Sequence, residues 1–206
     1  MAVEVFDSML LQGIRAGQVP ARTQAARDWY RNQAKAATKT ARNRSSGDRL
    51  IKEIVADRGS NGRFILGNMY LFAYDPKHKD TLPYYDRFPL IFPINKAKGG
   101  FLGINMHYLP PPLRAKLMDQ LYTVVTNKNF DESTRLKASY NILNGASKFA
   151  PFKPTVKHYL NAHVRSKPAY INPAEWDMAL FLPLQKFVGA SATQVYADSR
   201  KIIRGR

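Results

Sequence analysis

The sequence contains no cysteine. This absence excludes disulfides, thiolate nucleophiles and every zinc site built on cysteine. Long apolar runs are also absent, since the longest, such as residues 178–183, are far too short to span a bilayer. The chain carries no GxSxG, GxGxxG or Walker-type motif, so neither a serine nucleophile nor a phosphate-binding loop is marked. We therefore expect a soluble protein that is not an enzyme and that needs no cofactor.

Acidic residues are scarce beside basic ones. Asp and Glu number 15 against 32 Lys and Arg, which gives a formal net charge of +17. A surplus of this size attracts polyanions over long distances, and nucleic acid is the commonest of them, with anionic membranes and acidic proteins as alternatives. We expect nucleic acid in the surroundings of this protein.

Composition divides the 206 residues into three zones. Residues 1–63 are polar, basic and typical of helices, residues 64–109 are rich in aromatics, Gly and Pro, and residues 110–206 return to helical periodicity between prolines. The pattern predicts an α+β fold, with a small antiparallel β-sheet packed with several short α-helices. We expect two parts, namely a basic helical N-terminal arm over residues 1–63 and a compact α+β domain over residues 64–206.

Three runs in the middle zone predict strands. Residues 63–74, 88–94 and 101–109 are rich in aromatic and β-branched side chains and are bounded by Asp-Pro, Gly-Gly and Pro-Pro punctuation. Pro89 and Pro93 indicate that the second strand lies at an edge of the sheet, because proline cannot donate a hydrogen bond to a ladder.

Helices are predicted on the C-terminal side of these strands. One begins at Pro111 and carries a leucine stripe, and a second covers residues 132–144 with Gly145 as the residue just after its end. Asn172 is a predicted N-cap, and Ser191 opens a capping box in front of the last helix. This last helix leads into a basic tail.

One loop gathers side chains that can bind metal. Asp75, His78, Asp80 and Asp86 lie close together in the sequence, and such carboxylates can hold a divalent ion for phosphodiester cleavage. Against this, Asp75-Pro76 is an ordinary turn, the neighbouring lysines would repel a metal, and none of the four histidines has the spacing of a zinc site. A metal-dependent nuclease stays an alternative, but we expect no metal.

The sequence feature that most favours nucleic-acid binding is a run of basic residues in the arm. Between residues 22 and 44 there are seven basic residues and a single acid. Four of the cations step by four residues, which stacks them along one side of a helix, where they repel one another unless an anion lies alongside. A DNA phosphate backbone supplies that anion without any reading of sequence, and the alternative is a solvated helix face. The candidate nucleic-acid-binding residues, including a second basic group near the C-terminus, are Arg22, Arg27, Arg31, Lys35, Lys39, Arg42, Arg44, Arg200, Lys201 and Arg204.

The arm offers little to a hydrophobic core. Residues 23–40 contain five alanines and no Gly or Pro, but only Trp29 and Tyr30 are large and apolar. Helix propensity is therefore high while the capacity for packing is low. We expect residues 15–49 to project from the compact body as a helix against DNA or a neighbouring subunit, and to be mobile in the isolated protein.

Aromatic residues crowd the predicted strands. Tyr70, Phe72 and Tyr74 alternate so that they share one face of a strand. Such a face is either a platform on which bases stack or an ordinary core-facing surface. We expect core packing.

Several stretches resemble a known family. The strings GNMYLFAYDPKHKDTLPYYDRFPLIFPI and GGFLGINMHYLPPPLRAKLMDQLY, followed by FKPTVKHYL and EWDMALFLP, resemble the DNA end protector family of large contractile-tailed bacteriophages. The resemblance covers residues 64–203 and is one of overall texture, not of a catalytic motif. The basic arm lies outside it.

The resemblance implies a virion structural protein that binds the end of packaged double-stranded DNA and shields that end from host exonucleases. No catalytic residue comes with it. Implied partners are the DNA end and other virion proteins in a symmetric assembly. The alternative is an architectural neck, tail or baseplate component that contacts only other virion proteins, with its basic arm on acidic neighbours.

Overall fold

The structure is a computed structural model that describes residues 63–181 and 184–204, and before them only residues 15–17, 25, 28, 29 and 32. Most of the expected arm therefore lies outside the described residues, and the boundary between arm and domain stays a prediction. Trp29 is described, and it is partly buried against the main hydrophobic core. At this residue the chain contacts the body instead of projecting clear of it, because burial of an indole ring is favourable.

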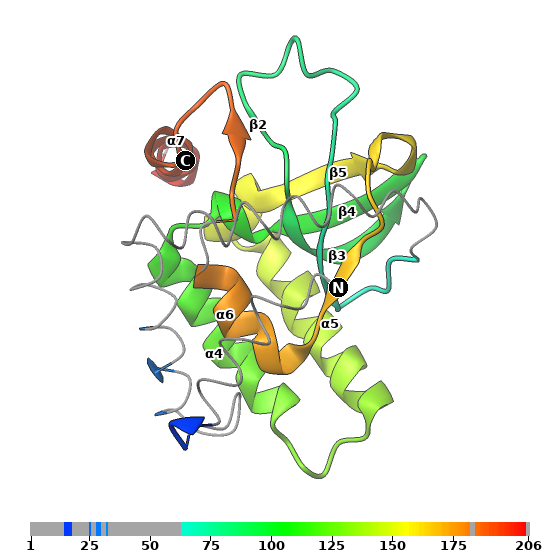
Figure 1. Cartoon of the computed structure of the whole chain (residues 1–206), viewed down its shortest axis with the longest axis vertical. Coiled ribbons are helices and arrows are strands. Elements are labelled where there is room, and N and C mark those ends of the chain that lie inside the picture. The colour runs from blue at the N-terminus through cyan, green and yellow to red at the C-terminus, as the bar shows by residue number, and fades with distance from the viewer. Residues whose placement is uncertain are drawn as a thin grey trace.

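A five-stranded antiparallel sheet forms the centre of the protein (Figure 1). Its strand order is β5-β4-β3-β1-β6, and a separate two-stranded sheet pairs β2 with β7. The strands are β1 Met69–Leu71, β2 Tyr85–Asp86, β3 Leu90–Ala97, β4 Gly100–Asn105, β5 Val156–Leu160, β6 Ala169–Ile171 and β7 Phe187–Val188. Together with the helices described below, these sheets confirm the predicted α+β class.

Strand β3 lies in the middle of the sheet, between β4 and β1. The prediction of an edge strand is wrong, and the two prolines show why. Pro89 precedes the first residue of the strand, Leu90. Pro93 lies where the register with β4 shifts before Asn95, and its carbonyl accepts a hydrogen bond from the Gly67 N–H at 3.0 Å. The ladder is irregular at Pro93, so a residue without an N–H donor fits into this central strand.

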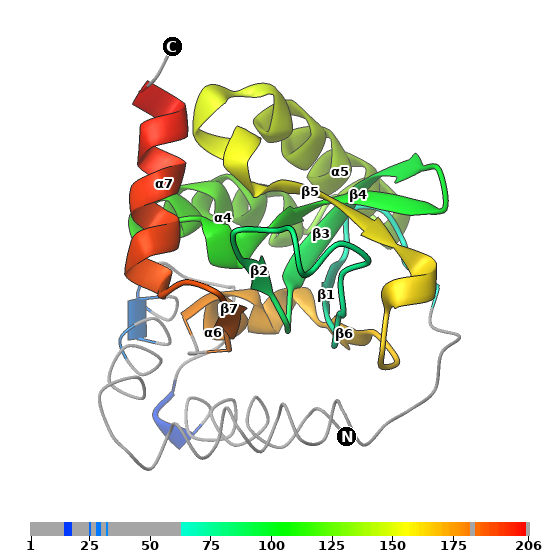
Figure 2. The ribbon, with the colours of Figure 1, turned by 90° about the horizontal axis from the view of Figure 1, so that it is seen from above.

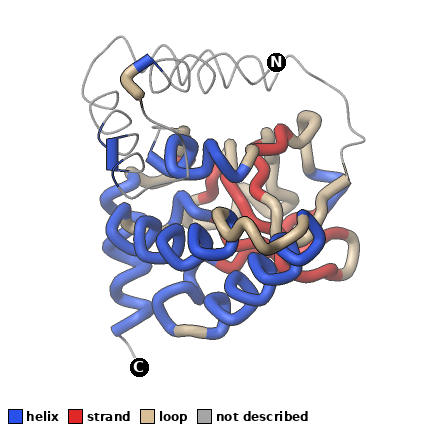
Figure 3. Tube along the Cα trace, turned by 90° about the horizontal axis from the view of Figure 1, so that it is seen from below, coloured by secondary structure: helices blue, strands red, loops and turns tan. Residues whose placement is uncertain are grey.

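Four α-helices follow or flank the strands in the part of the chain that the structure describes. They are α4 Pro111–Val125, α5 Glu132–Lys148, α6 Trp176–Phe181 and α7 Ala192–Arg204. Short 3-10 helices are η1 Met106–Tyr108, η2 Ala150–Thr155, η3 Asn161–His163 and η4 Pro173–Glu175. Seen from below, α4, α5 and α6 lie in front of the strands and cover one face of the sheet, whereas α7 stands at the side (Figures 1 and 3).

The two faces of the sheet carry different cores. On the helix-covered face, strand residues such as Phe92 and Ile104 pack with Leu121 of α4, Leu143 of α5 and Trp176 at the start of α6. The opposite face carries an aromatic cluster, whose buried members are Tyr70, Phe72, Tyr74, Ile91, Phe101 and Tyr159. The expectation that the alternating aromatics of the first strand pack in a core is confirmed.

Helix starts follow the predicted capping residues. Ser191 accepts a hydrogen bond through Oγ from the Gln194 N–H at 3.2 Å, which confirms Ser191 as the N-cap of α7, while the Gln194 side chain donates to Asp198 at 2.9 Å. At the predicted Asn172 start, the Asn172 N–H donates to the Glu175 carboxylate at 3.3 Å, and a 3-10 turn leads into α6. Gly145 does not end α5, because the helix continues to Lys148.

Gly145 is therefore a glycine in a helix interior, and its replacement is expected to stabilise the protein. A Cβ atom added there meets nothing within 4 Å. Gly145→Ala is expected to raise the free energy of unfolding by about 0.5–1 kcal/mol, because alanine loses less backbone entropy on folding. Urea unfolding measures this change.

Gly99→Ala is the matched control. A Cβ atom at Gly99 makes only an ordinary 3.6 Å contact with Leu160, but the backbone has φ +74°. This substitution is expected to destabilise the protein by about 1–2 kcal/mol. Equal effects of the two changes would contradict the assignment of Gly145 to a regular helix.

Candidate nucleic-acid interface

The seven predicted binding residues of the arm, from Arg22 to Arg44, lie outside the described residues. Their part in binding stays a prediction. The other three predicted residues, Arg200, Lys201 and Arg204, are described, and all three are exposed on α7.

Helix α7 is fixed to the body by one side and presents its cations from the other. Val195 is fully buried, and the Ser199 hydroxyl donates to the Tyr108 carbonyl at 3.4 Å. Lys201 lies 3.6 Å from the Asp198 carboxylate, so its charge is partly compensated. Cations in the last turn also interact favourably with the helix dipole. The result is a rigid helix with an exposed basic end.

Arg114 of α4 ties this helix to the rest of the protein, although it is buried. Its guanidinium donates to the carbonyls of Leu109 at 2.7 Å and Leu180 at 2.8 Å, and to the Tyr196 hydroxyl of α7 at 2.6 Å. Burial lowers the pKa of Arg114, while the contact with Tyr196 acts in the opposite direction. No sequence motif marks this residue, because its partners are carbonyls brought together only by the fold.

A second buried polar network surrounds Asp86. Its carboxylate lies 2.8 Å from Nδ1 of His107 and accepts hydrogen bonds from the Asn105 side chain at 3.0 Å and the Phe88 N–H at 3.2 Å. Burial acts to raise the pKa of Asp86, but His107 and these donors outweigh it, so the pKa lies below its ordinary value. The Asn105 amide also donates to the Tyr159 hydroxyl at 3.0 Å. This network holds β2, β4 and β5 together.

The loop that suggested a metal site does not assemble one. Asp86 is buried in the network just described, whereas Asp75 pairs at the surface with Lys79 at 3.1 Å and Arg165 at 3.6 Å. The Lys79 ammonium lowers the pKa of Asp75, as expected for a carboxylate with a cationic partner. Over residues 63–181 and 184–204, no three His, Asp or Glu side chains come together in a group that suits a metal ion.

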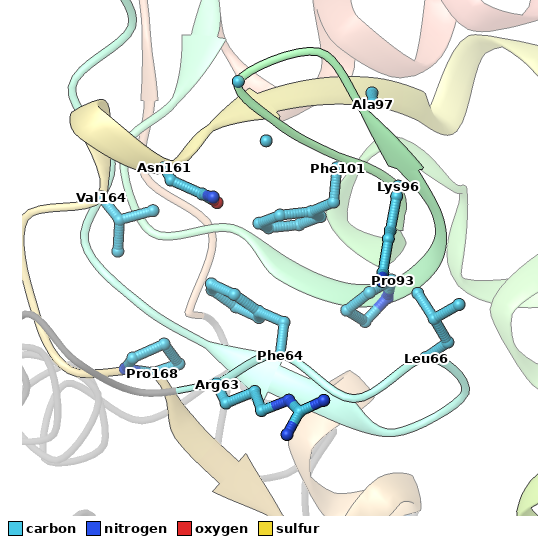
Figure 4. Close-up of a pocket in the computed structure, with 12 residues that line it drawn as sticks. Arg63, Phe64, Leu66, Pro93, Lys96, Ala97, Phe101, Asn161, Val164 and Pro168 are labelled. Atoms are coloured by element: carbon cyan, nitrogen blue, oxygen red, sulfur yellow. The ribbon is translucent and has the colours of Figure 1, made fainter.

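A hollow of about 770 Å³ opens beside the turn between β3 and β4 (Figure 4). The rings of Phe64 and Phe101 lie inside it with their centroids 4.3 Å apart and their planes inclined by 40°. Gly99, in the turn itself, has the positive φ that favours glycine, which confirms the turn predicted from Gly-Gly. The residues that line the hollow are Arg63, Phe64, Leu66, Pro93, Lys96, Ala97, Gly99, Gly100, Phe101, Asn161, Val164 and Pro168.

The charged residues in the three segments that line this hollow are all basic. Its lining comes from residues 63–66, 93–101 and 161–168, and no Asp or Glu occurs in any of these segments. The cations in them are Arg63, Lys96, Lys98, Arg165 and Lys167, and all five are exposed. Arg63 and Lys96 line the hollow itself, whereas Arg165 pairs with Asp75. Sequence reasoning missed this site because the three segments are far apart in the chain and meet only through the sheet.

The two basic surfaces lie on opposite sides of the body. Helix α7 stands at one side, whereas the turn between β3 and β4 lies at the other (Figures 1 and 2).

Among the described helices none combines the length and the hydrophobicity that a bilayer crossing requires. The fold and its surfaces thus define a class, a basic α+β protein whose exposed cations suit a polyanion.

The comparison with protein families gives the particular family. Residues 18–204 match the model of the family described as the phage T4 terminal DNA protecting protein. The chain belongs to this family, and the resemblance seen in the sequence is confirmed. The match also covers most of the basic arm, which that resemblance left out. No curated protein and no solved structure gives a significant match.

Proposed function

We propose that this protein binds the end of packaged double-stranded DNA without sequence specificity and shields that end from host exonuclease, without catalysing a reaction itself. The observation that carries the proposal is the family match over residues 18–204, whose description names the protection of terminal DNA. The net charge of +17 supports it, because a cationic protein concentrates DNA by long-range attraction.

Phosphate contacts supply the binding in this proposal. The arm from Arg22 to Arg44 is the main contact, and the basic end of α7 is a second one. Such contacts fix a protein on the duplex and carry no sequence information. In this scheme residues 1–63 form a binding arm, and residues 64–206 form the body that positions it.

The protein acts as part of a larger particle in this proposal. It resides in the virion, and in the host cytoplasm during assembly, and its partners are the DNA end and other virion proteins in a symmetric assembly. Cross-linking in intact particles tests this placement. We expect cross-links to the terminal part of the genome. Cross-links to neck, tail or baseplate proteins alone would support the architectural alternative instead.

The basic end of α7 gives a prediction of its own. Replacing Arg200, Lys201 and Arg204 by Gln is expected to reduce the slope of log affinity against log salt by about 2–3 units, since each lost phosphate contact contributes about 0.9. Fluorescence anisotropy with a linear duplex measures this slope over a series of salt concentrations.

A second triple variant controls for the loss of net charge. Lys116, Lys128 and Lys137 are exposed residues of α4, α5 and the loop between them, and their replacement by Gln removes the same charge. We expect this variant to change the salt slope much less. Equal slopes for the two variants would show that α7 makes no local contact with DNA.

A further inference from the structure

The hollow beside the β3–β4 turn has three features that suit a small anionic ligand. Its interior is aromatic, the charged side chains that line it in the described part of the chain are Arg63 and Lys96, and its volume of about 770 Å³ is within the range of small-ligand sites. Phe64 is partly exposed, whereas Phe101 is 5% exposed and packs against the Phe64 ring. A ligand with a flat apolar face and a negative charge suits this lining.

A single nucleotide meets both requirements. Its base has a π-face that stacks on an aromatic ring, and its phosphate pairs with cations. Inside a duplex the base faces are covered by neighbouring base pairs. A terminal nucleotide, in contrast, has one uncovered face and frays easily from its partner, so its base is free to stack on an aromatic ring.

The side chains are arranged for such a ligand. Lys96 lines the hollow from β3, and Lys98 follows in the turn. The Asn161 side chain points toward the Phe101 ring and places an amide at the opposite wall (Figure 4). Gly100 brings β4 so close to β5 that a Cβ atom there would collide with the Tyr159 carbonyl, which keeps this wall of the hollow free of side-chain bulk.

We propose that this hollow holds the terminal nucleotide of a DNA strand, with its base against Phe64 and its phosphate at Lys96 and Lys98. This inference rests on the proposed function, since it assumes that DNA ends are the ligand. It adds the element that the basic arm and α7 lack, because phosphate contacts alone do not distinguish an end from an internal stretch of duplex.

The test compares DNA with and without ends. The probes are a short linear duplex and a relaxed covalently closed circle of the same sequence, bound to the full-length protein. We expect the wild-type protein to prefer the linear form by about tenfold or more, the contribution of one stacked base. Because the base reaches Phe64 only while its phosphate is held, Lys96→Gln/Lys98→Gln is expected to abolish this preference while salt-dependent binding of both forms remains.

A charge-matched variant and a second readout show whether a change in end preference comes from the hollow itself. Lys116→Gln/Lys128→Gln removes the same charge elsewhere and is expected to keep the end preference. A duplex with 2-aminopurine as its terminal base gives an independent readout, because its fluorescence is expected to change on binding to wild-type protein more than that of an internal 2-aminopurine.

The outcomes separate the two proposals. Absence of salt-dependent binding to either DNA form would overturn the proposed function. Equal binding of linear and circular DNA by the wild-type protein would overturn the terminal-nucleotide site alone. So would an end preference that the Lys96→Gln/Lys98→Gln variant retains, which would leave the hollow to another ligand, such as an acidic segment of a neighbouring protein.

Discussion

Replacing Arg27, Arg31, Lys35 and Lys39 by Gln is expected to flatten the salt dependence of binding to linear duplex DNA by about 3–4 units of the log–log slope. Four cations spaced by four residues line one side of the predicted helix, and each phosphate they neutralise releases counterions. Between about 50 and 200 mM salt, the wild-type protein should therefore lose about 100-fold more affinity than the variant. Anisotropy titrations at several salt concentrations measure both slopes.

A variant that keeps the charges is the control for this result. Changing Arg27 and Arg31 to Lys preserves all four cations and should leave the salt slope unchanged, because the contact depends on charge and not on the shape of guanidinium. Both variants are expected to unfold at the wild-type temperature, since the stripe offers no apolar side chain to the core. An unchanged slope in the Gln variant would place the DNA contact elsewhere.

The largest effect on stability is expected from Asp86→Ala. This change removes the buried partner of His107 and leaves the Asn105 amide and the Phe88 N–H without their acceptor. Breaking a buried pair from one side typically costs about 3–5 kcal/mol, because the remaining groups stay desolvated. Chemical unfolding measures the loss. Asp80→Ala is the control, since Asp80 lies exposed in the preceding loop and should change stability by less than about 0.5 kcal/mol.

The stability of the protein is expected to depend on pH through the Asp86 carboxylate. Burial alone would raise the pKa of Asp86, but His107 and the hydrogen-bond donors bring it below the unfolded-state value. Ionised Asp86 therefore stabilises the fold above about pH 4, and this contribution is lost as the pH falls through the folded-state pKa. We expect the stability difference between wild type and Asp86→Ala to shrink below about pH 4. An unchanged difference at lower pH would contradict the stabilising role of ionised Asp86.

Local signals in the sequence predicted much of the fold. The leucine stripe after Pro111 and the capping residue Ser191 are sufficient to predict α4 and α7, because both depend on neighbours within a few turns. The short strands β5 and β6 were missed. Strand β5 includes Lys157 and His158, and β6 has only three residues, so neither shows a clear alternation. The position of β3 depends on pairing with distant strands, which its prolines do not determine.

The sequence predicted only the part of the candidate interface that lies within one helix. The exposure of Arg200, Lys201 and Arg204 follows from the pattern of α7, and the structure confirms that exposure. The hollow near Phe64 could not be predicted, since its walls come from three separate segments. The pair of Asp86 and His107 is equally hidden, because 21 residues separate its members and no motif has that spacing.

Digestion by an exonuclease shows most directly whether the protein shields a DNA end. A linear duplex labelled at one terminus is incubated with the full-length protein and then with a processive exonuclease that loads only at duplex ends. We expect the wild-type protein to preserve the labelled terminus at low salt, while an endonuclease still cuts the interior of the same DNA. Loss of the terminus at the same rate with and without saturating protein would show that the protein does not protect DNA ends.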